Sequence, residues 1–329
     1  MPNFIPNFFN WACTNGQPPS PVGSPMKYVQ QTYGEKGPKF AHEPDTSPPL
    51  NAEQKKRIER IVGALLYYAI AQDNTYLTAV CDIAREQKHA TERTLEKVDR
   101  LLAYAAKYPN NILEYKKSDM ILRVYSDGSY QSLPDSRSMA GAFFFCGNKD
   151  DTDFVNGPID AMSTVIKSIL SSTGECEFAS LFLAGTRALP HIQTLVNLGH
   201  PQPLTGTPIL VDNTFAVGLA NDNIKAKHSK AIDMRFHWIR DRVRQGQFQV
   251  SWVEGIKQVA DFFTKALPVW KHKQAMHYMV RVPFPIDSGT EPTGTAKSIT
   301  RSQPWRKQTR NTHHTHPTST SLTTSYYVH

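Results

Sequence analysis

The spacing of apolar residues divides the chain into a helical part and a part that alternates strands with helices. Between residues 51 and 118, apolar positions recur every three or four residues, the period of a helix with one buried face. Asn51 is a candidate N-cap for the first helix, and Pro109 ends the last. Further helices are expected over 75–87 and 91–108. Residues 51–118, called the helical segment below, are predicted to act mainly by packing.

From residue 119 the period changes. Residues 120–125 alternate between two mostly apolar faces, as in a central strand that is covered on both sides. Four further strands are expected near 138–148, within 153–162, at 209–212 and at 247–255. Helices are expected from Ser172 or Thr173 to just before Pro190, and then over 191–199, 213–222, 231–246 and 257–267. This order predicts an α/β fold with a mixed five-stranded sheet flanked by helices.

Four acidic residues occupy comparable places in this pattern. Asp127 follows the first strand, Asp212 follows the run ILV, and Glu177 and Asp261 fall in expected helices. An Asp-Gly pair such as that at Asp127 is also a common turn signal when taken alone. Four acids that converge without a basic partner in their motifs would repel one another, so we expect a divalent cation to neutralise them. Hard oxygen ligands favour Mg²⁺ or Mn²⁺.

Several motifs resemble a known family. The runs YSDGSY, SSTGECEF, ILVDNTFAVGL, SKAIDMRFHWIRDRVRQGQF and QVADFFTKAL are similar to the ribonuclease H domain of copia-type retrotransposon Pol polyproteins. The helical segment resembles the connection between the reverse transcriptase and that domain. The resemblance covers roughly residues 30–285, and the five motifs stand in the family's order. It implies a C-terminal fragment of the polyprotein with a ribonuclease H-like fold, preceded by a helical connection.

The resemblance also implies a function. It predicts an endonuclease that hydrolyses the RNA strand of RNA–DNA hybrids with two divalent ions. Asp127 would bridge both ions, Glu177 and Asp212 would each hold one side, and Asp261 would hold the ion of the nucleophile. Glu175, two residues before Glu177, is an alternative ligand. The implied partners are the hybrid and an upstream reverse transcriptase of the same polyprotein; the chain itself carries no paired-aspartate motif of a polymerase.

Charge and composition agree with a nucleic-acid partner. The formal net charge is +8, and several basic residues lie close together in residues 225–244. This stretch could bind the phosphates along a duplex, or it could form a solvated helix face. Asn213 could contact an RNA 2′-hydroxyl or simply cap a helix. Lys55, Lys56 and Arg57 could also reach the phosphates of a duplex. The predicted nucleic-acid-binding residues are Asn213, Lys225, Lys227, Lys230, Arg235, Arg240 and Arg242.

The remaining features concern the ends of the chain and its location. Residues 1–50 carry many Pro, Gly and Asn and are expected to be flexible, and residues 269–329 are expected to form a basic, Thr- and His-rich disordered tail. Residues 119–268 form the predicted catalytic domain. The four cysteines lack metal-site spacing, and no leader or membrane span is evident, which predicts an intracellular protein. The alternative function is a catalytically silent, nucleic-acid-binding remnant of a decayed element.

Overall fold

The computed structural model describes residues 3–13, 16–29, 45–224 and 234–283. All of them belong to one compact unit. None of the helices in this described part of the chain combines the length and the apolar character that a membrane span needs.

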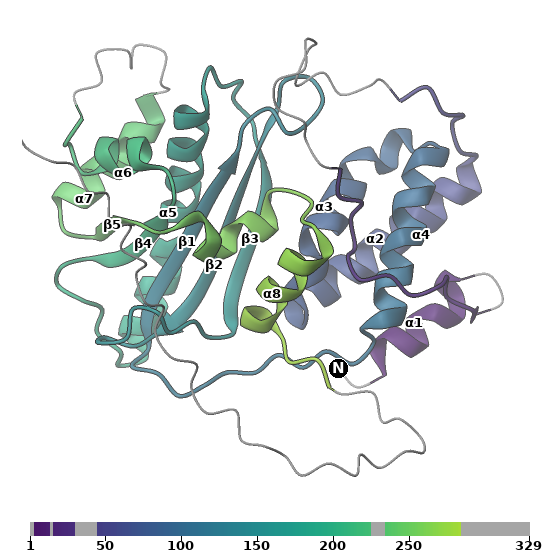
Figure 1. Cartoon of the computed structure of the whole chain (residues 1–329), viewed down its shortest axis with the longest axis horizontal. Coiled ribbons are helices and arrows are strands. Elements are labelled where there is room, and N and C mark those ends of the chain that lie inside the picture. The colour runs from purple at the N-terminus through teal and green to yellow at the C-terminus, as the bar shows by residue number, and fades with distance from the viewer. Residues whose placement is uncertain (1–2, 14–15, 30–44, 225–233, 284–329) are drawn as a thin grey trace, which may run out of the picture. The chain divides into compact units, whose positions relative to one another are not determined.

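A mixed five-stranded sheet forms the centre of the unit (Figure 1). Its strands stand in the order β3-β2-β1-β4-β5. Antiparallel pairing joins β1 to β2 and β2 to β3, whereas β1 pairs with β4, and β4 with β5, in parallel. This confirms the predicted α/β fold with a mixed five-stranded sheet. The strands are β1 (Ile121–Ser129), β2 (Ser138–Gly147), β3 (Pro158–Ile166), β4 (Thr207–Val211) and β5 (Phe248–Trp252).

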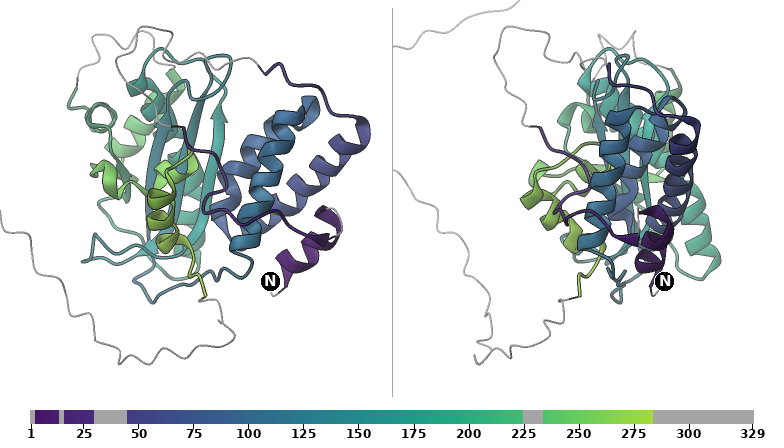
Figure 2. Two further views of the ribbon diagram at one scale, coloured as in Figure 1. Left: turned by 45° about the vertical axis from the view of Figure 1, so that its right-hand side comes forward. Right: turned by 90° about the vertical axis from the view of Figure 1, so that its right-hand side faces the viewer.

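The two faces of the sheet are covered by different helices, as the two views of Figure 2 show. Leu122 and Val124 of β1 share one hydrophobic core with α5 (Thr173–Asn197), α6 (Thr214–Ala220) and α7 (Trp238–Arg244). Tyr125 of β1, and Phe143 and Phe145 of β2, belong to a second core on the opposite face. That core includes α2 (Ala52–Ala71), α3 (Leu77–Glu86) and α4 (Glu92–Lys107) of the helical segment. The expected alternation of β1 between two apolar faces is therefore confirmed.

Local sequence signals explain where the helices of the helical segment begin. Asn51 accepts a hydrogen bond from Gln54 N–H while the Gln54 side chain bonds back to the Asn51 N–H, which completes a capping box. Thr91 starts α4 in the same way with Thr94. Short 3₁₀ turns, η2 (Asn74–Tyr76) and η3 (Gln87–His89), connect the helices.

Ordered helices also occur in both flanks, where the sequence predicted flexibility. Helix α1 (Phe4–Ala12) packs on α2, and the Phe4 ring stacks on Tyr68 with centroids 4.8 Å apart. Helix α8 (Val269–Met279) buries His272, Met276 and Met279. Each helix is short, with 9 and 11 residues, so its order depends on tertiary burial rather than on its own helix-forming tendency. Most of the predicted tail, from residue 284 on, lies outside the described residues.

Several expected elements differ from the structure. Helix α5 continues through Pro190 because that proline lies on the exposed side, where water can bond the carbonyl that loses its N–H partner. The third strand begins only at Pro158, since the Asn156 side chain ties the preceding loop to Lys116 and Cys146. The expected long helix at 231–246 is a 3₁₀ turn, η5 (Met234–His237), followed by α7; residues 231–233 lie outside the described residues.

Candidate metal centre

The parallel pairing of β1 and β4 brings the first two predicted acids to one edge of the sheet. Tyr125 lies opposite Leu210, so Asp127 and Asp212, each two residues further along, reach the same level. Asp127 is 2% exposed and still lies within β1, whereas Asp212 directly follows β4. Parallel strands present their carboxyl ends at a common edge, which is where side chains from neighbouring strands can act together.

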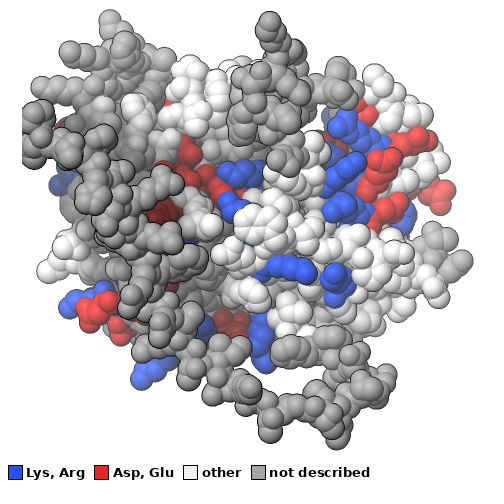
Figure 3. Space-filling view, viewed as in Figure 1, with Lys and Arg blue, Asp and Glu red and all other residues white. Residues whose placement is uncertain are grey.

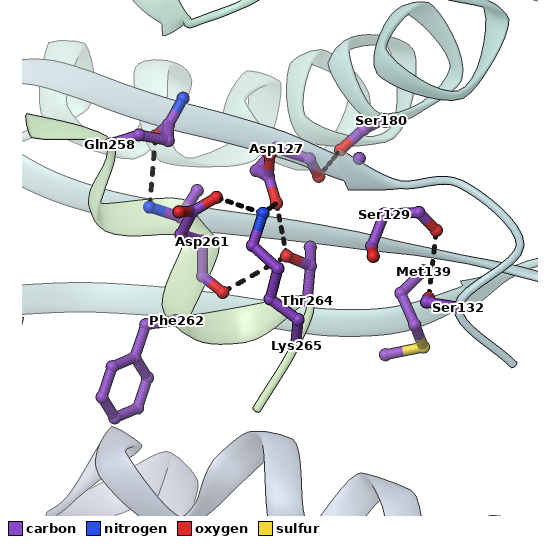
Figure 4. Close-up of polar contacts among 12 residues, drawn as sticks. Asp127, Ser129, Ser132, Met139, Ser180, Gln258, Asp261, Phe262, Thr264 and Lys265 are labelled. Carbon is purple, nitrogen blue, oxygen red and sulfur yellow. Dashed lines mark hydrogen bonds and ion pairs between the residues drawn. The ribbon is translucent and has the colours of Figure 1, made fainter. Parts of the chain in front are cut away.

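The third acid, Asp261, lies in the 3₁₀ turn η7 (Val259–Phe263), which replaces the expected amphipathic helix. Two side chains bracket this turn against β1 (Figure 4). The Gln258 side chain donates to Ser126 O at 3.0 Å and accepts from Ala260 N–H at 3.2 Å. At the other end, the Thr264 hydroxyl contacts Asp127 Oδ2 and Asp261 O. Asp127, Asp212 and Asp261 each offer a carboxylate oxygen, and these three atoms lie within 4.8 Å of one another.

Glu177, the fourth predicted acid, faces β1 from the first turns of α5. Its Oε2 accepts the Gly128 N–H at 3.1 Å. A Cβ at Gly128 would stand 2.8 Å from Cys176 O, so only glycine lets α5 approach the strand this closely. Glu175 instead accepts from the Ser171 N–H and hydroxyl at 2.7 and 2.8 Å, at the start of α5. The local geometry therefore favours Glu177 over Glu175 as the acid that faces Asp127; its role as a metal ligand stays a prediction.

Two lysines pair with the acids, which corrects the expectation that the motifs contain no basic partner. Lys265 Nζ lies 2.7 Å from Asp261 Oδ1 and 3.9 Å from Asp127 Oδ2. Lys271 of α8 approaches Asp261 Oδ2 at 2.5 Å. Lys265 follows Asp261 by four residues, a spacing at which side chains meet on one side of a helical turn, so a signal for this pair was present in the sequence. The Lys271 contact depends on how α8 folds back and has no such signal.

Burial and mutual repulsion raise the pKa values of the carboxyl groups. For Asp127 the pKa rises to about 6, mainly through burial and also through Asp261 and Asp212, against the opposing charge of Lys265. Burial raises the pKa of Glu177 to about 9, and Asp127 and Asp212 add to the shift. The Asp212 pKa is raised by burial and by Asp261. The raised pKa values mean that ionising all of these carboxyl groups together is unfavourable. Because the groups are hard oxygen donors, a divalent cation such as Mg²⁺ fits the cluster.

The structure accounts for only part of the predicted nucleic-acid surface. Lys225, Lys227 and Lys230 lie outside the described residues, and Arg235 lies in η5. On α7, Arg240 pairs with Asp222, and Arg242 stands 5.1 Å from the Trp238 ring centroid.

Other candidates for phosphate contact also have partners within the protein. Asn213 caps α6, accepting from Ala216 N–H at 3.1 Å. Arg57 donates to Ala12 O at 3.1 Å through Nε. Over the helical segment, basic side chains lie beside acidic ones in Figure 3. Binding of nucleic acid by these residues therefore stays a prediction.

Parts of two transposon polyproteins are similar to this chain in sequence. The chain is 25% identical over 226 residues to the retrovirus-related Pol polyprotein from transposon TNT 1-94 of Nicotiana tabacum, a match that covers 67% of this chain and 16% of that polyprotein. It is 29% identical over 218 residues to the Pol polyprotein from transposon RE1 of Arabidopsis thaliana, covering 63% and 14% of the two. The chain is related to retrotransposon Pol polyproteins. The predicted resemblance is thereby confirmed, and the chain spans well under a fifth of these relatives.

Comparison with solved structures gives ribonuclease H domains. The N-terminal RNase H domain of rv2228c from Mycobacterium tuberculosis is 16% identical, with a TM-score of 0.32, and covers 48% of this chain and 97% of that chain. LC11-RNase H1, solved in complex with an RNA/DNA hybrid, is also 16% identical, with a TM-score of 0.32, and covers 44% and 93%. No family model matches this Pol-related chain.

Proposed function

We propose that this chain is a metal-dependent endonuclease that hydrolyses the RNA strand of RNA–DNA hybrids, as part of a retrotransposon polyprotein. The observation that carries the proposal is the convergence of Asp127, Asp212 and Asp261 within 4.8 Å, from two strands and a separate turn. Glu177 faces β1 beside them. The relatedness to retrovirus-related Pol polyproteins supports the polyprotein context.

The residues that would hold two Mg²⁺ or Mn²⁺ ions are Asp127, Glu177, Asp212 and Asp261. Bound there, the ions would lower the pKa of a water and stabilise the charge on the leaving oxygen. The protein's own contribution is to orient the acids: Thr264 contacts the Asp127 carboxylate, and Gly128 N–H bonds Glu177. Lys265 and Lys271 offset part of the negative charge of Asp261.

The proposed substrate contacts come from Asn213 and from the basic residues between positions 225 and 242. The proposed hybrid-binding residues, including Arg240 and Arg242, would hold phosphates, and selectivity for RNA would come from 2′-hydroxyl contacts and A-like duplex shape. An upstream reverse transcriptase domain of the same polyprotein is the proposed partner that delivers the hybrid.

A cleavage assay tests this proposal. The purified chain is incubated with a hybrid labelled on its RNA strand and with Mg²⁺, beside an Asp127→Asn variant and an EDTA control. Glu175→Gln serves as the matched control. It also removes a buried carboxylate, but that carboxylate bonds Ser171 at the start of α5 and not β1. We expect cleavage by wild type and by Glu175→Gln, and none with Asp127→Asn or EDTA.

The outcomes separate the candidate functions. If Asp127→Asn cuts as fast as wild type, the assignment of the acids is wrong. Hybrid binding without cleavage by the wild type would favour the silent remnant.

A further inference from the structure

The turn that carries Asp261 is held between the sheet and the helical segment. Asp261 points toward Asp127, whereas the Phe262 ring next to it points away, toward the helices (Figure 4). Phe262 and Phe263 are buried in the core that also contains the apolar faces of α2, α3 and α4. One face of η7 thus belongs to the acidic cluster and the other to the helical segment.

A buried hydrogen bond joins the helical segment to the backbone of this turn. The Thr78 hydroxyl, on α3, donates to Phe262 O at 2.8 Å across 184 residues of sequence. Thr78 is 5% exposed, and the Phe262 side chain is 4% exposed. The accepting carbonyl belongs to the Phe262–Phe263 peptide, one peptide unit beyond Asp261, so the bond restrains the backbone of the turn directly after Asp261.

Other contacts come from α4 and α8. The Phe262 ring lies 4.7 Å from the His272 ring, centroid to centroid. His272 Nε2 in turn contacts the Tyr104 hydroxyl at 3.1 Å. A five-residue 3₁₀ turn has few and poorly aligned hydrogen bonds of its own, so external contacts of this kind decide its position.

We propose that the helical segment helps to build the acidic site, because the Thr78 hydrogen bond holds η7 in the position that places Asp261 beside Asp127 and Asp212. Thr78 is a positioning residue: it acts through the Phe262 carbonyl and contacts none of the acids. The inference rests on the proposed function for its catalytic consequence. Metal-ligand distances tolerate deviations of only about 0.2 Å, so a small relaxation of η7 is enough to weaken the site.

Three variants of the full chain test the role of the hydroxyl. Thr78→Val keeps the shape of the side chain but leaves the Phe262 carbonyl without its donor. Thr78→Ser keeps the hydroxyl and is the rescue variant. Thr94→Val is the control for loss of a buried threonine hydroxyl elsewhere in the helical segment, since Thr94 bonds Thr91 and Glu86 within that segment.

Two measurements do not depend on cleavage. Amide hydrogen exchange by mass spectrometry should show residues 259–264 exchanging at least about tenfold faster in Thr78→Val, at a temperature where the variant is folded. Mn²⁺ affinity, measured by titration, should fall by about 10- to 100-fold. In the cleavage assay, kcat should fall with KM for the hybrid unchanged. Thr78→Ser and Thr94→Val should match wild type in all three.

The inference is overturned if folded Thr78→Val retains wild-type exchange at 259–264 and wild-type Mn²⁺ affinity, or if Thr94→Val has the same effects. If the wild type cuts no hybrid, the proposed function fails, and the exchange and Mn²⁺ measurements still decide whether Thr78 positions Asp261.

Discussion

Gly141 sets how closely η7 can approach the sheet, and its replacement by alanine gives a sharp prediction. Gly141 pairs with Asp127 across β1 and β2. A Cβ there would stand 2.7 Å from Thr264 Cγ2, 2.9 Å from Ala260 O and 2.9 Å from Phe263 Cβ. Ordinary contacts begin near about 3.5 Å, so the turn would have to move by about 0.6 Å. The Ala260 oxygen and Phe263 Cβ cannot rotate away, and Asp261 lies between these two residues.

We expect two measurable effects of Gly141→Ala. Overpacking should lower the free energy of unfolding by about 1–3 kcal/mol, seen in urea titrations. A shift of this size should also reduce the rate of RNA-strand cleavage by about 10- to 100-fold at saturating Mg²⁺, because Asp261 leaves its place beside Asp127.

Gly63→Ala is the matched control for these measurements. Gly63 lies within α2, and a Cβ there meets no atom within 4 Å. The change should stabilise the protein by about 0.5–1 kcal/mol and leave the cleavage rate unaltered. A Gly141→Ala protein with wild-type stability and rate would refute the argument that η7 is seated against Gly141.

Three further predictions concern charge and packing. Asp160, bonded to Arg187 and His191, has a pKa lowered to about 2 from 3.8 by these partners, which outweigh its burial. Its ionised form therefore stabilises the fold above about pH 4, and the contribution is lost as the pH falls toward 2. In urea titrations, Asp160→Asn should lower the free energy of unfolding by about 1–2 kcal/mol at pH 7 and by almost nothing at pH 2. An equal loss at both pH values would contradict this. Lys265→Met removes a cation that pairs with the acids. In EDTA, the melting temperature of this variant should lie below that of wild type, and Mg²⁺ should raise it more than it raises that of wild type. An equal Mg²⁺ response in both proteins would contradict the role of Lys265 in offsetting the negative charge. Phe144→Ala, at a fully buried position, should cost about 3–5 kcal/mol of unfolding free energy; a loss below about 1 kcal/mol would mean that Phe144 contributes little to its core.

Local patterns predicted the sheet and the helical segment because both depend on periodic burial. Leu122 and Val124 alternate with Tyr125 in the sequence, and the structure divides them between the two cores as that alternation requires. Pro190 misled the prediction because exposure of its position, which makes the proline tolerable, depends on tertiary packing. Helix α8 was missed for a related reason: its buried Met276 and Met279 are few and depend on the neighbouring helices.

The site was predictable to the extent that its residues follow strands. Asp127 and Asp212 come together through backbone pairing, which the strand pattern implies. Asp261 was singled out by its place in an expected helix, but its turn is a 3₁₀ turn, and the contacts of Lys271 with Asp261 and of Thr78 with Phe262 join residues far apart in sequence. Such contacts leave no periodic signal, so only the three-dimensional structure reveals them.

The acids are held in place in two ways, by backbone pairing of strands and by side-chain contacts, and these differ in how much sequence change they tolerate. Neighbouring strands lie about 4.8 Å apart whatever their side chains, because backbone hydrogen bonds set that spacing. The separation of Asp127 from Asp212 is therefore inherited with the sheet, however far the surrounding sequence drifts. Asp261 has no comparable guarantee, since side chains such as Gln258, Thr264 and Thr78 hold its turn. Lineages that share this sheet can thus retune the site through substitutions around η7 alone, without rebuilding the fold.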